Sequence, residues 1–435
     1  QLKEAVTNYQ KAIEKNPEFS EAHNNLGNAY KDLGEFDNAI NGYQRAVEIN
    51  PKFAAAYYNL GTVFKKINQK EKLLTLFENA YLLDPDLDFI LGDLLTARMQ
   101  FCNWSEYTDL LINLQKKITE NKKVVDPFNL LGLIDDTALQ KKAAQIFSEY
   151  HNLKKITLYK IKPYAKKSKI RIGYFSADFH NHATMHLMAE FFELHDKGLF
   201  EIFAFSFGPD NIDNWRERVI SSFDDFIDVR DKTDQEISLM SKKLEIDIAI
   251  DLKGFTKDCR PNIFAEVCAP VQVSYLGYPG TMGAEYIHYL IADQTLIPED
   301  TQNLYCEKIV YMPNTYQVNM AKRDISEVTL SRNDLNLPSD GFIFCCFNNT
   351  YKITPSTFDS WMQILLAVDG SILWLFESNQ NSVKNLIKEA KKYGINGNRL
   401  IFASHMPIDQ HLIRIRTADL FLDTLPYNAH TTSSD

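Results

Sequence analysis

The chain has 435 residues, 45% of them hydrophobic and 24% charged, which is the composition of a globular protein with room for about two to four domains. A formal net charge of −10 argues against nucleic acid as a partner, because binding it requires a basic surface. No apolar run approaches the roughly 20 residues of a membrane-spanning helix. The six cysteines show no C-x-x-C spacing, so we expect no disulfides, no bound metal and a cytoplasmic location without membrane contact.

A tetratricopeptide repeat array is predicted for residues 1–86. Pro17, Pro51 and Pro85, each preceded by Asn or Asp, recur at an interval of 34 residues, the length of one helix pair. Small Ala and Gly residues recur with the same spacing and would let the two helices of a unit approach closely. The chain begins with what reads as the second helix of a unit, so we expect further repeats upstream.

Asn25 and Asn59 occupy equivalent positions on the first helices of successive repeats. Their amides could line a groove that hydrogen-bonds the backbone of an extended peptide, or they could cap and pack locally. The residues alone leave both interpretations open. Because repeat arrays bind peptides or partner proteins, the repeats by themselves would support a scaffold function.

The 34-residue period is lost in a connecting region, 87–168, where helical patterning persists. The clearest helix is expected at Thr137–Leu153, which carries apolar residues at helical spacing. Seven lysines between Lys154 and Lys169 indicate a solvated interdomain segment rather than a patch for an anionic surface.

From residue 169 onward, short apolar runs alternate with amphipathic stretches, a pattern typical of parallel sheets covered by helices on both faces. Two series are predicted, at 169–325 and 338–435, joined by a loop-like bridge. The expected strands are Ile170–Phe175, Phe200–Phe207, Ile246–Asp251, Val271–Leu276 and Tyr289–Ala292, then Phe342–Phe347, Ile372–Phe376, Leu400–Phe402 and Asp419–Leu422. The expected helices are Thr184–Leu194, Thr233–Leu244, Pro355–Ala367, Gln380–Tyr393 and Pro407–Thr417.

Polar residues follow several of these strands. His180, His182 and His186 fall after the first one, where His182 could act as an acid, a base or a hydrogen-bond donor. Asp251 ends the third strand and could guide a proton or simply shape a turn. Lys352 could neutralise a phosphate as a point charge or lie on the surface. Together they favour an anionic, nucleotide-bearing ligand in a cleft between the two sheets.

Two loops rich in small residues complete the candidate site. The Gly277–Gly283 loop could let backbone approach a sugar or phosphate closely, or it could be a plain multi-turn loop. The loop 422–435 leads from the last strand into His430-Thr431-Thr432, as in a helix N-terminus that binds phosphate, although such residues also cap helices without a ligand. Neither series carries G-x-G-x-x-G or a P-loop, which argues against a dinucleotide site and a P-loop ATPase.

In combination, these motifs resemble the O-linked N-acetylglucosamine transferase family, which includes plant SPINDLY-type O-fucosyltransferases and bacterial members. After the repeats, the resemblance rests on Arg171-Ile-Gly-Tyr-Phe-Ser-Ala-Asp-Phe, Asp251-Leu-Lys-Gly-Phe-Thr, Leu276-Gly-Tyr-Pro-Gly-Thr-Met-Gly, Tyr351-Lys-Ile-Thr-Pro-Ser-Thr and His430-Thr-Thr. It implies a GT-B fold of two Rossmann-like domains, the second incomplete because the family continues past Asp435. It also implies inverting transfer of N-acetylglucosamine from UDP-N-acetylglucosamine to protein Ser or Thr hydroxyls, without metal or further cofactor. The short bridge is similar to that of bacterial members.

The resemblance also implies roles for single residues. Lys352 would hold the diphosphate, Asp435 the ribose and His411 the uracil, while His182 would lie beside the sugar and the acceptor. Further donor contacts are implied for Asn349, Met406, His430, Thr431 and Thr432. The sugar and acceptor pocket would include His186, Leu276, Gly277, Pro279, Gly280 and Thr281. The proton acceptor is left open between His182, Asp251 through a water, and the donor phosphate.

Two positions depart from the family pattern. Asn349 stands where the animal enzyme has a donor-contacting glutamine, and Ile408 stands where it has a lysine near the uracil. The alternatives are therefore a fucosyltransferase that uses GDP-fucose, or a glucosyltransferase on the same frame. A third alternative is a non-catalytic repeat scaffold whose transferase half is vestigial.

Overall fold

The computed structural model describes residues 2–151, 164–165, 167–323 and 325–435. Contacts divide the chain into two compact units. The first contains Gln1–Val125, Asn349–Pro355 and Ser378–Glu389, and the second contains Asp126–Asn348, Ser356–Glu377 and Ala390–Asp435. The division does not follow the order of the chain, because two C-terminal segments group with the N-terminal helices. Most of the lysine-rich segment predicted to join the domains lies outside the described residues, and in the part that is described no helix is long and apolar enough to cross a membrane.

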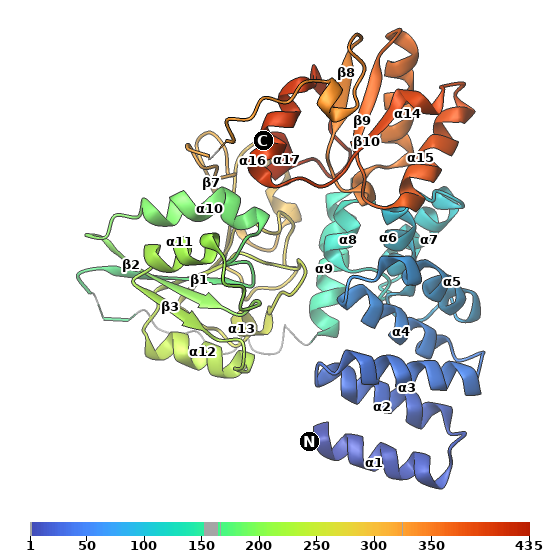
Figure 1. Cartoon of the computed structure of the whole chain (residues 1–435). Helices are drawn as coiled ribbons and strands as arrows, with labels where there is room; N and C mark the ends of the chain where they lie inside the picture. Colours follow the sequence, from blue (N-terminus) through green and yellow to red (C-terminus); the bar gives the residue numbers. More distant parts are fainter. Residues whose placement is uncertain (1, 152–163, 166, 324) are drawn as a thin grey trace. The chain divides into compact units, whose positions relative to one another are not determined.

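The predicted repeats appear in the first unit as a stack of paired helices (Figure 1). A Cβ placed on Gly27 would lie 2.7 Å from the ring of Tyr43, and a Cβ placed on Gly61 would lie 2.4 Å from the ring of Phe77. The small residues therefore do let the paired helices approach closely, as their spacing indicated. The helices are α1 (Leu2–Lys15), α2 (Ser20–Asp32), α3 (Phe36–Ile49), α4 (Ala54–Lys66) and α5 (Leu73–Leu83), with a 3-10 turn, η1 (Lys70–Lys72), before α5.

Helix α6 (Ile90–Gln100) continues this stack and is followed by α7 (Tyr107–Thr119). Ile90, Leu94 and Ala97 of α6 are buried in the same apolar core as Phe77 of α5. Burying a side chain such as Ile or Leu contributes about 1.5–3 kcal/mol, so α6 is an integral part of the array rather than a linker.

The second unit begins with α8 (Pro127–Leu131) and α9 (Thr137–Tyr150). Asp136 caps α9 by accepting the backbone N–H of Leu139 at 3.0 Å. The hydroxyl of Ser148, buried on α9, donates to the carbonyl of Met282 at 2.6 Å. The predicted helix thus exists and supports the glycine-rich loop.

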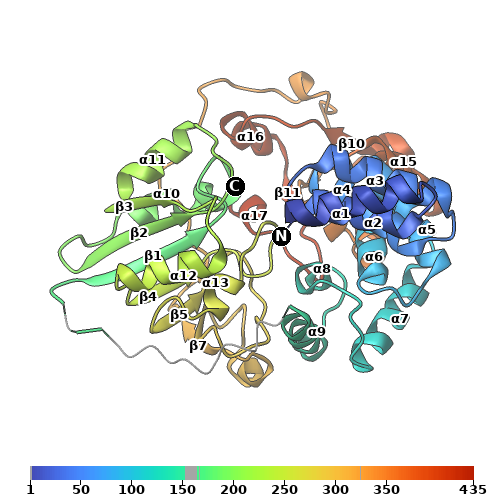
Figure 2. The same ribbon diagram turned by 90° about the horizontal axis from the view of Figure 1, so that it is seen from below.

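A parallel seven-stranded sheet forms the first Rossmann-like domain of the described chain, in the order β3-β2-β1-β4-β5-β6-β7. Figure 2 shows this order from β3 to β7. The strand order reverses between β1 and β4, which is where such folds bind ligands. The strands are β1 (Ile170–Ser176), β2 (Phe200–Ser206), β3 (Asp225–Asp228), β4 (Ile248–Asp251), β5 (Val271–Ser274), β6 (Tyr289–Ala292) and β7 (Lys308–Tyr311).

Helices cover both faces of this sheet, as the alternating pattern predicted. In Figure 1, α10 (Ala183–Glu193) and α11 (Asn214–Ser222) lie on one face, and α12 (Asp234–Lys243) and α13 (Asn262–Ala265) lie on the other. The central strands are almost continuously buried because both of their faces are covered.

A four-stranded parallel sheet, ordered β10-β9-β8-β11, forms the second Rossmann-like domain in the described residues. Its order reverses between β8 and β11. The strands are β8 (Ile343–Cys346), β9 (Ile372–Phe376), β10 (Leu400–Ala403) and β11 (Leu420–Phe421). The helices are α14 (Pro355–Ala367), α15 (Gln380–Lys392), α16 (Ile408–Arg414) with the 3-10 turn η6 (Ile415–Thr417), and the short α17 (Thr431–Ser434).

Two edge strands and one helix were not predicted. β3 and β7 lie at opposite edges of the first sheet and are largely half-buried or exposed, so their apolar runs are short and interrupted by charge. α11 carries mixed charged and apolar residues, which hides its buried face. The central strands and α14 match their predicted ranges closely because their burial is nearly complete or strongly periodic.

Candidate active site

The first cluster of candidate residues lies where the strand order of the first sheet reverses. β1 and β4 pair in parallel with Phe175 opposite Asp251, so their carboxyl ends lie side by side. The loop 177–182 follows β1, and Asp251 ends β4. The predicted neighbourhood of the two loops is therefore confirmed by the strand pairing.

A buried ion pair joins these two loops. The Lys253 ammonium lies 2.9 and 2.7 Å from the two carboxylate oxygens of Asp178, and the two residues are 4% and 7% exposed. Removing one partner of such a pair leaves a charge buried without compensation, which costs several kcal/mol. Both residues stand in motifs noted in the sequence, but the pairing could not be read from it because 75 residues separate them.

His182 is the N-cap of α10, with its side chain 42% exposed. Its Nδ1 accepts the backbone N–H of Thr184 at 3.2 Å and lies 3.6 Å from a carboxylate oxygen of Asp178. Burial lowers the pKa of His182, with Asp178 raising it and Lys253 lowering it. A neutral ring whose Nδ1 accepts carries its proton on Nε2, so this geometry presents His182 as a hydrogen-bond donor.

Asp251 is 3% exposed, and burial raises its pKa to about 6. Its carboxylate accepts the backbone N–H of Lys253 at 2.8 Å, and that of Gly254 also lowers the pKa. The side chain thus shapes the turn after β4. A role in proton transfer stays a prediction.

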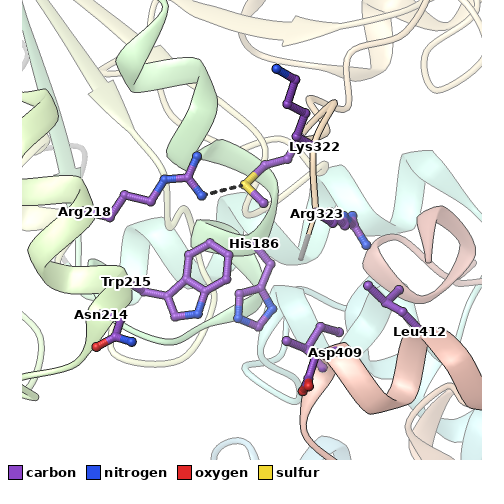
Figure 3. A pocket seen from close by; sticks show the side chains of 10 residues that line it. His186, Asn214, Trp215, Arg218, Lys322, Arg323, Asp409 and Leu412 are labelled. Atoms are coloured by element: carbon purple, nitrogen blue, oxygen red, sulfur yellow. Dashed lines mark hydrogen bonds between the residues drawn. The ribbon is translucent and has the colours of Figure 1, made fainter. Parts of the chain in front are cut away.

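His186 lines a cavity of about 480 Å³ between helices of the two Rossmann-like domains (Figure 3). Its ring lies 4.6 Å from that of Trp215, and burial lowers its pKa to about 4. The cavity also carries cations, among which Arg218 is held by both oxygens of Glu193 and contacts the sulfur of Met320. The lining residues are His186, Asn214, Trp215, Arg218, Met320, Lys322, Arg323, Ile408, Asp409 and Leu412.

The glycine-rich loop is held from within by a buried carboxylate. Thr281 donates its hydroxyl to Glu307 at 2.7 Å, and the N–H of Met282 donates to the other Glu307 oxygen at 2.6 Å. Glu307 is 4% exposed, and burial raises its pKa. Thr281 also accepts two backbone N–H groups, so its hydroxyl serves the loop itself.

The loop also lies close to the turn after β4. A Cβ on Gly277 would lie 2.1 Å from the carbonyl oxygen of Leu252, so only glycine fits there. Leu276 adopts a positive φ of 67° and is buried, as are Gly280 and Thr281, whereas Pro279 is half-buried. Of the predicted pocket residues in this loop, Gly277 and Pro279 are the more accessible.

The second cluster lies where the order of the other sheet reverses, between β8 and β11. Asn348 follows β8 and donates to Asp423 at 3.2 Å and to the hydroxyl of Thr424 at 2.9 Å. Its amide oxygen accepts the hydroxyl of Thr432 at 2.6 Å. Asp423 in turn accepts the backbone N–H of Ala429 at 2.8 Å, so neutral groups and one carboxylate fold the last loop.

His430 and Thr431 lie at the start of α17 in this loop. The His430 carbonyl accepts the N–H groups of Ser433 and Ser434, and its ring packs edge-on against Tyr427 at 5.2 Å. Thr431 and Thr432 are half-buried. The predicted phosphate contacts of these residues stay predictions, and the Thr432 hydroxyl already donates to Asn348.

His411 lies on α16, with its Nδ1 accepting from Arg414 at 2.8 Å and its ring edge-on to Phe347 at 5.1 Å. Burial, with Arg414 and then His405 adding to it, lowers the pKa of His411 to about 4. Its Nε2 lies 3.9 Å from Asp435, which is bonded to Arg323. The structure thus brings together the residues predicted for uracil and ribose. Met406 is half-buried in the segment before α16.

Asn349 and Lys352 belong to the other compact unit. Asn349 is exposed and precedes a 3-10 turn, η4 (Thr350–Lys352). Lys352 is 8% exposed. The sequence predicts it beside the last loop, but its structural neighbours are the helices of the first unit.

In the repeats, Asn59 does not stand alone. Its amide donates to Asn24 at 3.0 Å, and the Asn24 amide donates to Asn25 at 3.5 Å. The equivalent positions are thus linked across successive repeats through a third amide that the sequence spacing did not single out. Asn25 and Asn59 are half-buried, and peptide binding by them stays a prediction.

Residues 102–328 and 319–435 match the model of glycosyl transferase family 41, and residues 1–34, 27–68 and 54–87 match tetratricopeptide repeat models. The chain belongs to glycosyl transferase family 41. The resemblance noted in the sequence, and the fold that it implied, are thereby confirmed.

Several named proteins are similar to this family 41 chain. It is 37% identical over 272 residues to the probable UDP-N-acetylglucosamine–peptide N-acetylglucosaminyltransferase SEC of Arabidopsis thaliana, covering 61% of this chain and 28% of the relative. It is 27% identical over 384 residues to the UDP-N-acetylglucosamine–peptide N-acetylglucosaminyltransferase of Caenorhabditis elegans, covering 61% and 33%. The chain thus spans about a third or less of the length of these relatives.

A solved structure, a mutant of the O-GlcNAc transferase of Thermobaculum terrenum, is also similar. The TM-score is 0.69 at 26% identity, and the match covers 98% of this chain and 76% of the other. The similarity therefore extends over the repeats as well as over both Rossmann-like domains.

Four residues of the site were missed from the sequence as functional candidates: Asp178, Lys253, Glu307 and Asn348. Each is at least 90% buried and polar, and each hydrogen-bonds a loop that carries a predicted site residue. The available signal was their position directly after a strand or inside a recognised motif. Their partners lie between 25 and 84 residues away, which no local pattern reveals.

Proposed function

We propose that this family 41 chain transfers N-acetylglucosamine from UDP-N-acetylglucosamine to Ser or Thr hydroxyls of proteins. The observation that carries the proposal is the pair of polar clusters at the two strand-order reversals, His182 with Asp178 and Asn348 with Thr432. Open parallel sheets bind ligands at these points, and the printed names of the relatives assign this transfer to them. The large identical share with those relatives supports the same donor over GDP-fucose.

The chemistry requires stabilisation of the diphosphate as it leaves the sugar. We assign this to Lys352, as a fixed positive charge, and to the N–H and hydroxyl groups of Thr431 and Thr432. Asp435 and His411 would hold the ribose and the uracil. Because Asp435 is bonded to Arg323 and Thr432 to Asn348, donor binding would exchange these contacts for contacts with the ligand.

The acceptor hydroxyl must lose its proton during the transfer. His182, with its proton on Nε2, would donate a hydrogen bond to the donor or the acceptor rather than take that proton. Asp251, acting through a water, and the donor phosphate are then the proton acceptors to be tested. No metal or further cofactor is part of this proposal.

The repeats would present polypeptide acceptors to the site, with the Asn25–Asn24–Asn59 amides contacting the peptide backbone. Deleting residues 1–85 is a poor test of this role, because Ile90, Leu94 and Ala97 of α6 lose the core in which they are buried. Alanine substitution of Asn25 and Asn59 keeps that core and should impair transfer to protein far more than hydrolysis of the donor. An equal loss of both would contradict a role in acceptor binding.

Calorimetry with UDP-N-acetylglucosamine, UDP-glucose and GDP-fucose tests the donor directly. We expect UDP-N-acetylglucosamine to bind most tightly. Binding of GDP-fucose alone would overturn the proposal in favour of fucosyl transfer, and binding of no nucleotide sugar would favour a scaffold function.

Lys352→Ala tests the assigned chemistry. We expect transfer to fall by about 10²–10³-fold, the usual effect of removing one group that stabilises developing charge. Lys391→Ala, at the exposed end of α15, is the control and should keep wild-type transfer. Wild-type turnover by Lys352→Ala would refute the role of this lysine.

A further inference from the structure

The turn that carries Lys352 is fastened to the carboxyl end of helix α6. The carbonyl oxygen of Gln100, the last residue of α6, accepts the hydroxyl of Thr350 at 2.8 Å and the side-chain amide of Asn379 at 3.0 Å. The next carbonyl, that of Phe101, accepts the side-chain amide of Asn385 at 2.9 Å. All of these residues belong to the same compact unit.

These contacts fill a need of the helix end. The last carbonyls of an α-helix have no partner within the helix and require donors from elsewhere. Here α6 is buried along almost its whole length, and Phe101 and Cys102, which follow it, are 2% and 1% exposed. A buried carbonyl left without a donor costs about 1–3 kcal/mol, so the three side chains are held firmly in place.

Thr350 is the residue that passes this anchorage to the lysine. It is 3% exposed, and its carbonyl lies 4.0 Å from the thiol sulfur of Cys102 while its hydroxyl donates to Gln100. The same carbonyl accepts the N–H of Ile353 at 3.0 Å, which closes the turn around Lys352. Both polar groups of Thr350 are therefore tied, on either side of the backbone that sets the start of the Lys352 side chain.

Asn379 and Asn385 fix the neighbouring helix to the same point. The Asn379 side chain accepts the N–H of Ser382 at 2.8 Å, so it caps the first turn of α15 while it donates to α6. The end of α6 thus joins the Lys352 turn, α15 and the repeat core into one packed body.

We infer that the carboxyl end of α6 positions Lys352, with Thr350 as the positioning residue, so that the placement of the diphosphate-binding charge is set by the helical array rather than by the second sheet. The inference rests on the proposed function of Lys352. Its consequence is that a movement of the repeats carries the lysine with it, which couples acceptor binding on the array to donor chemistry.

The test compares isosteric substitutions in the full chain. Thr350→Val removes the hydroxyl that donates to α6 and keeps the side-chain shape, while Thr350→Ser restores the hydroxyl. Thr96→Val is the matched control, because Thr96 is a buried residue of α6 whose hydroxyl donates to the Gly92 carbonyl at 2.8 Å within the helix. We expect Thr350→Val to lower kcat by about tenfold or more, Thr350→Ser to recover most of the loss, and Thr96→Val to keep the wild-type kcat.

A double-mutant cycle shows whether the effect passes through the lysine. In the Lys352→Ala background, Thr350→Val should cause no further loss of kcat, since there is no charge left to position. An additive loss, or a wild-type kcat in Thr350→Val alone, would overturn the inference.

Amide hydrogen exchange separates this inference from the proposed function. Thr350→Val should accelerate exchange at the N–H groups of Lys352 and Ile353 more than Thr96→Val does, whether or not the protein turns over. Unchanged exchange there would overturn the positioning role itself. Accelerated exchange together with wild-type turnover of Lys352→Ala would instead show that the proposed function of the lysine is wrong.

Discussion

The two strand-order reversals are built from different chemistry. At the first, buried charges hold the loops, with Lys253 on Asp178, and Asp251 and Glu307 on backbone N–H groups. At the second, a neutral amide, Asn348, links Thr424 and Thr432, and Asp423 is exposed. The first edge is therefore fixed by interactions that are costly to break, whereas the second has weaker bonds that a ligand can replace.

Lys253→Met should have the largest effect on this comparison, because it leaves Asp178 buried without its cation. We expect a loss of about 3–5 kcal/mol in the free energy of unfolding, measured by chemical denaturation. Lys257→Met, in the same loop but exposed, should change stability little. A loss of less than about 1 kcal/mol in Lys253→Met would show that the first edge is not held by this pair.

Asn348→Ala should destabilise the second edge by a smaller amount. It leaves the hydroxyls of Thr424 and Thr432 without a partner, and such groups cost about 1–3 kcal/mol in total stability. Its exposed neighbour offers the matched substitution, Asn349→Ala, which should be nearly neutral in the same unfolding experiment. If the two variants were equally stable, the network around Asn348 would not hold the last loop.

The two edges should also respond to pH with opposite sign. The folded pKa of His411 is about 4, below the value of roughly 6.5 in an unfolded chain, so its contribution to stability is present above pH 6.5 and is lost as pH falls toward 4. Asp251, with a folded pKa of about 6, contributes stability below its unfolded pKa, and this is lost as pH rises through 6.

His411→Gln isolates the response of the second edge. Between pH 7 and 5.5 the wild-type chain should lose about 1 kcal/mol more stability than this variant does, because only the wild type binds the extra proton on unfolding. Denaturation midpoints at the two pH values measure the difference. Parallel pH dependence of the two chains would show that His411 is not buried in its neutral form.

Much of the architecture could be predicted from local patterns. The strands Tyr289–Ala292 and Ile372–Phe376 and the helix Pro355–Ala367 have the predicted ranges, because buried strands read as apolar runs and amphipathic helices as a periodic pattern. The edge strands Asp225–Asp228 and Lys308–Tyr311 were missed, because partial exposure lets charge interrupt them. Sequence patterns are thus most informative where burial is complete.

The candidate site divides in the same way. His182, Asp251 and the glycine-rich loop were found at strand ends, since parallel strands deliver their following loops to one edge. Lys253 and Glu307 were not singled out as site residues, because their role depends on partners that are remote in the chain.

The sequence by itself determined the repeats, the two doubly wound sheets and the family, because helix and strand periodicity, the 34-residue spacing and the short motifs are all local in the chain. Only the tertiary structure decided which side chains hold these parts in place. The clearest case is Lys352, which follows a strand of the second sheet in sequence but is anchored through Thr350 to the end of α6, 250 residues from Gln100. Such contacts satisfy buried carbonyls and charges, and those requirements arise only once the chain has packed.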